Sequence, residues 1–292
     1  NAQTDASGNG NNFTNNNTVV TSTHTPTNSY ATLNPLQEVW GAAVTLSNGN
    51  LGADGTAATS WNNITATLPV TSGKWIFGSV GDALQSGYAA PFVCNETAYN
   101  AKDNNLETAT NVWGAVTKST TEFDDIDQGT VTGHTPSPNI AVGDYQLMAV
   151  DIDNLKCWAG YHDVSTGTTY WADASTGFTG DPAAGTNGMT LDGTTFYFGV
   201  MTYTGRGGTV DFGQGSLLSN VTIPTGFEFL NTTNIAANTT RTASDTNKYF
   251  QTVLYEGNGA GQRVGAFQPF DNTFTVAKSS LFDDANSESL TR

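Results

Sequence analysis

The chain has 292 residues, a length that suits about two domains or one large all-β domain with long arms. Charged residues make up 12% of it, against roughly 25% in an ordinary soluble domain, so 47 Thr, 29 Asn and 32 Gly carry much of the polarity. This composition argues against helical bundles and coiled coils. The net charge of −16, with basic residues scattered singly, argues against nucleic-acid and membrane-surface partners.

Residues 1–34 form the first segment and are predicted to be an extended arm or linker. They contain one charged residue, Asp5, and runs such as Asn15-Asn16-Asn17-Thr18. So few large apolar side chains cannot bury much surface, and such a segment becomes ordered only where something packs on it.

The next segment, residues 35–230, is predicted to be a single β-sandwich. Short β-branched and aromatic runs alternate there with Gly, Asn, Asp, Ser and Pro, which is typical of antiparallel sandwiches or barrels. The expected strands are Glu38–Leu46, Trp61–Leu68, Lys74–Val80, Tyr88–Val93, Asn111–Val116, Tyr145–Asp151, Lys156–Tyr161, Thr195–Tyr203, Thr209–Phe212 and Gly226–Leu230.

Within these strands the side chains alternate between two faces. Trp75 and Phe77 share one face of their strand, and Ile76 shares the other with Val80. In the strand 145–151 and just beyond it, Met148, Val150 and Ile152 are expected to face the core. Most of the six Trp and 15 Phe are therefore assigned to packing.

Residues 231–292 form a polar C-terminal extension with two further strand candidates, Tyr249–Tyr255 and Phe274–Ala277. They dock on the sandwich or begin a following domain. Cys94 and Cys157 both lie in apolar strand-like runs, which favours two buried free thiols over a disulfide. The three His are far apart in sequence, and no metal or cofactor site is predicted.

Several motifs in the middle segment resemble those of SPRY domains, which are concanavalin-like β-sandwiches. Ser72-Gly73-Lys74-Trp75 opens a strand as the SPRY "SGKW" motif does, and Gly143-Asp144-Tyr145 leads into Asp151-Ile152-Asp153 in the same way. Further matches are Lys156-Cys157-Trp158-Ala159-Gly160, the run from Gly180 to Asn187, Phe196–Val200 and Gly208–Gln214. Residues 161–171 replace the short hairpin that the family has after its "KIWFG" strand.

The flanking segments are similar to linkers in structural proteins of tailed bacteriophages, where such a module follows a laminin-G-like domain. The resemblance implies a non-enzymatic virion protein, a tail fibre or other host-adhesion appendage, that assembles with copies of itself and with other virion proteins. It also implies a lectin-like contact with host surface glycan or protein, without nucleic-acid or membrane partners. A capsid-surface decoration protein, a filament assembled by strand addition and, less favoured, a secreted carbohydrate-active hydrolase that uses Glu122 and Asp127 are the alternatives.

Five residues are candidates for ligand contact: Trp113, Tyr161, Trp171, Asp173 and Tyr203. The four aromatic residues lie in or beside predicted loops, where a sugar stacks on an exposed ring, and Asp173 follows Trp171 closely enough to bond sugar hydroxyls. Packing in the core is the alternative for each ring.

The acidic run Glu122-Phe123-Asp124-Asp125-Ile126-Asp127 is the one segment that suggests an enzyme. Concanavalin-like hydrolases carry similar strands, and retaining hydrolysis needs two carboxyl groups about 5–5.5 Å apart. An acidic loop is the preferred interpretation of these residues, and no catalytic residue is predicted. Two Ca²⁺ candidates, Asp151-Asp153-Asn154 and the three Asp of this run, are also interpreted as turn or loop residues.

Overall fold

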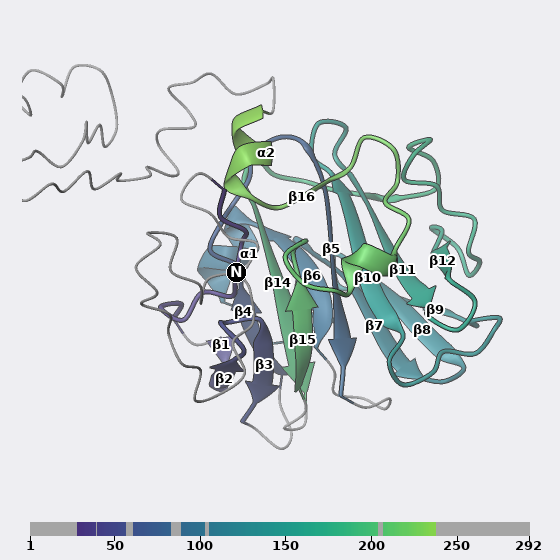
Figure 1. Cartoon of the computed structure of the whole chain (residues 1–292), viewed down its shortest axis with the longest axis horizontal. Coiled ribbons are helices and arrows are strands. Elements are labelled where there is room, and N and C mark those ends of the chain that lie inside the picture. Colours follow the sequence, from purple (N-terminus) through teal and green to yellow (C-terminus); the bar gives the residue numbers. More distant parts are fainter. Residues whose placement is uncertain are drawn as a thin grey trace, which may run out of the picture.

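The computed structural model describes residues 28–38, 40–56, 61–82, 89–102, 105–203 and 207–237. They form two antiparallel sheets that lie face to face, which confirms the predicted all-β sandwich (Figure 1). No helix in these ranges is long and apolar enough to cross a membrane. The predicted strands Tyr249–Tyr255 and Phe274–Ala277, and most of the predicted N-terminal arm, lie outside the described residues.

The first sheet has seven strands in the spatial order β1-β4-β14-β6-β7-β8-β9. Their bounds are β1 Trp40–Gly41, β4 Trp61–Thr65, β6 Ala90–Asn95, β7 Val112–Ser119, β8 Glu122–Asp127, β9 Thr130–His134 and β14 Phe196–Tyr203. The helix α1, Glu96–Ala101, follows β6 directly, and the side chain of Asn95 caps it by accepting from Thr97 N and Ala98 N.

The second sheet has nine strands, seven of them in the order β12-β11-β10-β5-β15-β3-β2. Their bounds are β2 Val44–Ser47, β3 Gly52–Gly55, β5 Lys74–Gly81, β10 Tyr145–Asp151, β11 Lys156–Asp163, β12 Thr168–Trp171 and β15 Gly207–Asp211. The short strand β13, Met189–Thr190, pairs with β11, and β16, Glu228–Phe229, pairs with β5 in parallel. The 3-10 turn η1, Leu218–Asn220, precedes β16, and the helix α2, Thr232–Ala237, follows it.

The alternation predicted from the sequence is confirmed. Trp75, Phe77, Met148, Val150 and Ile152 lie in the core between the sheets. Ile76, Leu147 and Ala149 lie on the outer face of the nine-stranded sheet, where the segment after β15 covers them. Cys94 and Cys157 are both buried and unpaired.

Three expectations need correction. The predicted strand Glu38–Leu46 is two strands in different sheets, β1 and β2, because the chain turns at Gly41 with a positive φ of 79°. The acidic run 122–127 is the strand β8 and not a loop. Ala31 and Leu33, in the predicted arm, are fully buried in the core.

Each side edge of the sandwich is closed by a segment of irregular chain. At one edge, β9 ends one sheet and β12 ends the other; residues 172–180 lie between them, with Phe178 packed on Phe123 and Tyr161. At the opposite edge, β1 and β2 end the two sheets, and residues 34–38 lie between them (Figure 1).

Candidate functional site

Trp171 lies at the end of the edge strand β12, on the outer face of the nine-stranded sheet. Its ring lies over Gly160 of β11, where a Cβ would come within 2.6 Å of Trp171 Cε3. Only 9% of the residue is exposed, because it packs in the outer cluster that also contains Trp158 and Phe227. The exposed remainder forms part of the wall of a cavity.

This cavity, called here the Trp171 cavity, has a volume of about 360 Å³. Three segments that are distant in sequence line it: the turn and strand of β12, the loop after residue 180, and the segment before β16. The lining residues are Gly167, Thr168, Thr169, Trp171, Asp181, Pro182, Ala183, Thr222 and Pro224.

The polar side chains among the lining residues are those of three threonines and one aspartate. Thr169 Oγ1 lies 2.9 Å from His162 Nδ1, which holds that hydroxyl in place. Asp181 Oδ1 accepts from Ala184 N at 3.0 Å, which fixes the carboxylate. Burial lowers the pKa of His162 despite the nearby Asp144 and Asp163, so this imidazole is neutral at neutral pH.

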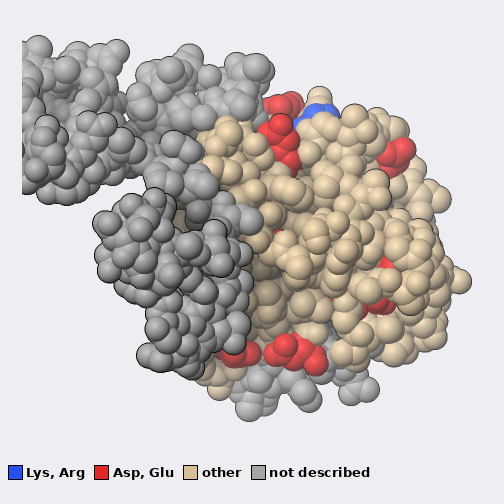
Figure 2. Space-filling view, in the orientation of Figure 1, with Lys and Arg blue, Asp and Glu red and all other residues tan. Residues whose placement is uncertain are grey.

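None of the lysines that the structure describes lines the Trp171 cavity. Each of them contacts an acceptor elsewhere: Lys74 pairs with Asp151, Lys102 with Glu38, and Lys118 with Glu107 and Asp124, while Lys156 Nζ donates to Gly185 O. The face drawn in Figure 2 is correspondingly mostly uncharged, with scattered acidic side chains. The electrostatic field around the cavity therefore disfavours anions.

Asp173, one of the predicted contact residues, is engaged within its own loop. Its carboxylate accepts from Ser175 N, Gly177 N, Thr179 N and Thr179 Oγ1. Although burial raises the pKa of Asp173, these hydrogen bonds outweigh it and the net pKa is lowered. The carboxylate thus stabilises residues 172–180, as an Asx turn does.

Trp113 and Tyr161 also lie elsewhere than expected for ligand contacts. Both are fully buried in strands between the two sheets, where Trp113 Nε1 donates to Thr190 O at 3.0 Å and Tyr161 Oη donates to Pro138 O at 3.2 Å. Their rings offer no face to a sugar, because the opposite sheet covers them.

Tyr203 ends β14 in the other sheet, half-buried, with its ring centroid 4.8 Å from that of Trp61. Of the five predicted residues, only Trp171 lines the Trp171 cavity. Of the polar lining residues, Asp181 lies in the SPRY-like run from Gly180 to Asn187, which did not single it out as a contact, and Thr168, Thr169 and Thr222 belong to no motif noted in the sequence.

Glu122 and Asp127 do not form the carboxyl pair that hydrolysis would need. From Phe123 to Asp127, β8 pairs with both neighbours in unbroken register, so side chains five residues apart point to opposite faces. Along a strand, five residues also span about 17 Å, far more than the 5–5.5 Å of a retaining pair.

The first Ca²⁺ candidate is a hairpin, as preferred from the sequence. Asp151 accepts from Asn154 N and Nδ2 and pairs with Lys74 at 2.8 Å, while Asp153 accepts from Gly73 N. Among the described residues, no group of three or more His, Cys, Asp or Glu is arranged to hold a metal ion.

The inner face of β8 and β9 carries a buried ionic pair that the sequence did not suggest. Asp125 Oδ1 lies 3.3 Å from His134 Nε2, and the two side chains are 4% and 0% exposed. Nδ1 of the same ring lies 3.0 Å from Gly177 O. Burial raises the pKa of the neighbouring Asp127.

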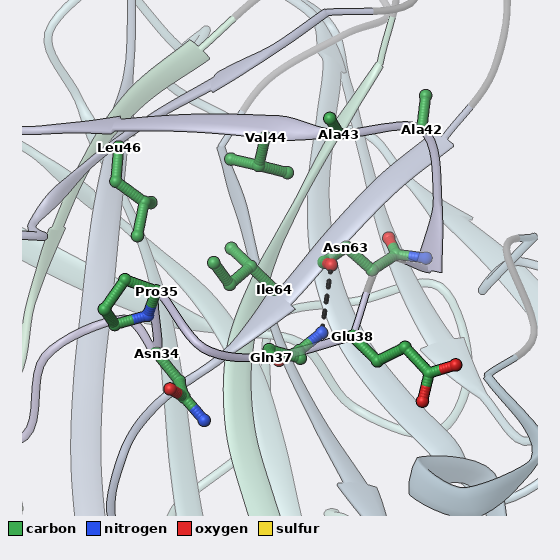
Figure 3. A pocket seen from close by; sticks show the side chains of 10 residues that line it. All are labelled: Asn34, Pro35, Gln37, Glu38, Ala42, Ala43, Val44, Leu46, Asn63 and Ile64. Atoms are coloured by element: carbon green, nitrogen blue, oxygen red, sulfur yellow. Dashed lines mark hydrogen bonds between the residues drawn. The ribbon is translucent and has the colours of Figure 1, made fainter.

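A second cavity of about 310 Å³ lies at the opposite edge, between β2 and β4 (Figure 3). Val44 and Leu46 extend from β2 toward Ile64, and Gln37 lies beneath them. The Gln37 amide is committed to the end of β4, because it donates to Asn63 O and accepts from Thr65 N and Oγ1. This cavity is lined by six apolar residues and by Asn34, Gln37, Glu38 and Asn63, and none of its lining residues carries a hydroxyl.

Comparisons with known proteins give similar folds only. No family model and no curated protein sequence matches the chain. Among solved structures, the SPRY domain of human HERC1 is similar over 61% of this chain and 96% of that one, with 14% identity and a TM-score of 0.42.

Two carbohydrate-binding proteins also match. The lectin UEA-II complexed with galactose covers 63% of this chain and 94% of its own, with 9% identity and a TM-score of 0.37. The carbohydrate-binding module CBM66 from Bacillus subtilis covers 60% and 94%, with 7% identity and a TM-score of 0.33. Such low values carry no argument about function, and the assignment of the sandwich rests on the strand pairing itself.

Proposed function

We propose that the sandwich is a non-catalytic recognition module that holds one neutral sugar residue of a glycan in the Trp171 cavity. The observation that carries the proposal is the composition of this cavity. Trp171, two prolines, three threonines and one aspartate are among the residues that line a single space of about 360 Å³.

A sugar ring matches such a lining on physical grounds. Its C–H groups form an apolar face that packs on indole and pyrrolidine rings, and its hydroxyls both donate and accept hydrogen bonds. Thr169 and Thr222 supply hydroxyls of the same dual character, and Asp181 supplies an acceptor. Pre-fixed side chains, such as Thr169 held by His162, reduce the entropy lost on binding.

The charge distribution favours a neutral sugar over an acidic one. A sialic acid or uronic acid carboxylate would meet Asp181 and no described cation at the Trp171 cavity. Like charges at close range cost binding free energy, because nothing offsets the desolvation of either carboxylate.

The setting in which we place this module is a host-adhesion appendage of a bacteriophage particle, assembled from several copies of the chain. The support is the SPRY-like motif series, the linker-like flanks and the low-charge, strand-rich surface. A capsid-surface location is the alternative. Electron microscopy of particles labelled with an antibody against this chain distinguishes tail from capsid, and absence of label on any particle would contradict the assignment.

The binding proposal is tested with the full chain on an array of neutral and sialylated glycans. Asp181→Asn keeps the acceptor for Ala184 N but removes the charge, and Thr222→Val removes a hydroxyl. Each substitution removes about 1–1.5 kcal/mol of hydrogen bonding and should weaken binding of the neutral hits by about tenfold.

Asp192→Asn serves as the matched control, because Asp192 is an exposed carboxylate that does not line the cavity. The Asp192→Asn variant should bind the neutral glycans with the affinity of the wild type. A set of hits dominated by sialylated glycans, or binding that neither cavity substitution changes, would refute the proposal.

A further inference from the structure

We propose that the buried pair of His134 and Asp125 fastens residues 172–180 to the sandwich and thereby makes the Trp171 cavity sensitive to pH. Only the last step, the effect on ligand binding, rests on the proposed function. The fastening concerns the protein alone and can be measured without a ligand.

The pair lies on the inner face of the seven-stranded sheet. Asp125 of β8 and His134 of β9 are diagonal neighbours there, since Asp125 is opposite Thr132 in the register. The imidazole is fully buried. Its Nδ1 lies 3.0 Å from Gly177 O in hydrogen-bond geometry, and its Nε2 lies 3.3 Å from Asp125 Oδ1, an ion-pair distance without hydrogen-bond geometry.

This arrangement fits the doubly protonated imidazole. A carbonyl oxygen only accepts, so Nδ1 must carry a hydrogen to bond Gly177 O, and Nε2 must carry one to interact favourably with the carboxylate. Burial by itself lowers the pKa of His134, but the contacts with Asp125 and Gly177 O outweigh it and the net pKa is raised.

The groups around the imidazole also favour its positive charge. Asp127 lies on the same strand as Asp125, and Asp173 acts on the ring from the loop side. Cys157 and Tyr161 come from β11, and burial raises the pKa of both, so they stay neutral while His134 titrates. No described lysine contacts the pair.

The pair holds residues 172–180, which connect two walls of the Trp171 cavity. Trp171 lies directly before residues 172–180, and Asp181 lies directly after them. Phe178, next to Gly177, packs with its ring on His134, Phe123 and Tyr161, and it also contacts Tyr170 of β12. Loss of the Gly177 contact would therefore loosen the aromatic packing that holds this loop against β12.

Deprotonation weakens the arrangement in either tautomer. Loss of the hydrogen from Nδ1 turns a lone pair toward Gly177 O and breaks that contact, whereas loss from Nε2 keeps the Gly177 hydrogen bond but turns a lone pair toward the Asp125 carboxylate, which repels the ring. Because the pKa of His134 is raised in the fold, the fastening is strongest well below that raised pKa and weakens as the pH rises through it.

Backbone hydrogen exchange of the full chain, normalised for the intrinsic effect of pH, measures the fastening. Between about pH 6 and about pH 9, protection of the amides of Gly177, Thr179 and Gly180 should fall about tenfold. The midpoint should coincide with the titration of the His134 imidazole followed by NMR. The Asp211 turn is the control, because its carboxylate accepts from Gly213 N and Gly215 N and neither described histidine interacts with it, so its protection should stay constant.

Two variants make the test decisive. In His134→Gln, protection of residues 177–180 should no longer depend on pH, and in Asp125→Asn the midpoint should move to lower pH. Constant protection in the wild type while His134 titrates, or a His134 pKa at or below its ordinary value, would overturn the inference.

The effect of pH on ligand binding is measured separately, from the retention of the neutral glycans that bind on the array at about pH 6 and about pH 9. Weaker retention at the higher pH in the wild type, and equal retention in His134→Gln, is the expected result, and equal retention in the wild type would overturn this step. If amide protection of residues 177–180 depends on pH but no glycan binds, the proposed function is refuted and the fastening stands.

Discussion

Gly160 is the residue on which the position of the Trp171 ring depends. It faces the outer side of β11, directly opposite Trp171 in the register, and any Cβ there would meet both the indole and the backbone of Tyr170 at 2.6 Å. The same relation occurs at Gly188, whose Cβ would approach Trp158 Cε2 to 2.5 Å. Glycine at these positions lets large aromatic rings lie flat on the sheet.

The substitution Gly160→Ala should therefore displace the Trp171 ring and destabilise the protein by about 1–3 kcal/mol, the cost of overpacking. Urea unfolding followed by tryptophan fluorescence measures it. Gly133→Ala in β9 is the control, because its nearest neighbour would be a side-chain oxygen at 3.5 Å, an ordinary contact. Equal stability of the Gly160→Ala and Gly133→Ala variants would contradict this account of the ring.

Between elements, one side chain joins the two sheets where β7 is irregular. The pairing of β7 with β8 shifts between Thr117 and Ser119, as at a β-bulge. Thr117 N donates instead to Gln146 Oε1 of β10, in the opposite sheet, at 2.9 Å. The buried amide of Gln146 thus satisfies a backbone group that the ladder leaves unpaired, which is how bulges are tolerated in cores.

Replacing Gln146 by Met keeps the length of the side chain but removes the acceptor. The buried Thr117 N–H then loses its partner, and the free energy of unfolding should fall by about 1–3 kcal/mol. Chemical denaturation gives the value. A Gln146→Met protein as stable as the wild type would show that water or a shifted ladder satisfies Thr117 instead.

For the whole molecule, the titrating groups predict greatest stability at mildly acidic pH. The raised pKa values of His134, Asp124 and Asp127 mean that their contributions are lost as the pH rises through those values. Asp163 and Asp173 have lowered pKa values. Their contributions to stability are therefore present above the ordinary value of 3.8 and are lost as the pH falls below it.

The lowered pKa of His162 adds a contribution that is present above pH 6.5 and is lost as the pH falls below it, so the maximum of stability should lie near pH 6.5. Calorimetry should give a higher Tm at about pH 6.5 than at about pH 9, and His134→Gln should reduce this difference. A Tm that rises steadily toward alkaline pH would contradict the sign of these contributions.

The local pattern of the sequence determined the sandwich and most of its central strands. Alternation fixes the faces of a strand through backbone geometry alone, so the inward sets of β5 and β10 were predictable. The local sequence also determined the hairpin at Asp151–Asn154, because Asp and Asn side chains stabilise turns through hydrogen bonds to nearby backbone groups.

Only the tertiary structure decided which residues meet. Trp113 and Tyr161 are aromatic residues near loops, and nothing in their neighbours shows that the opposite sheet covers them. β8 was unpredictable as a strand because Asp is rare in strands, and only the fold brings Lys118 of β7 to Asp124 and His134 of β9 to Asp125. The Trp171 cavity joins residues up to 57 positions apart, Gly167 to Pro224, whose proximity depends on the packing of the sheet and not on local sequence.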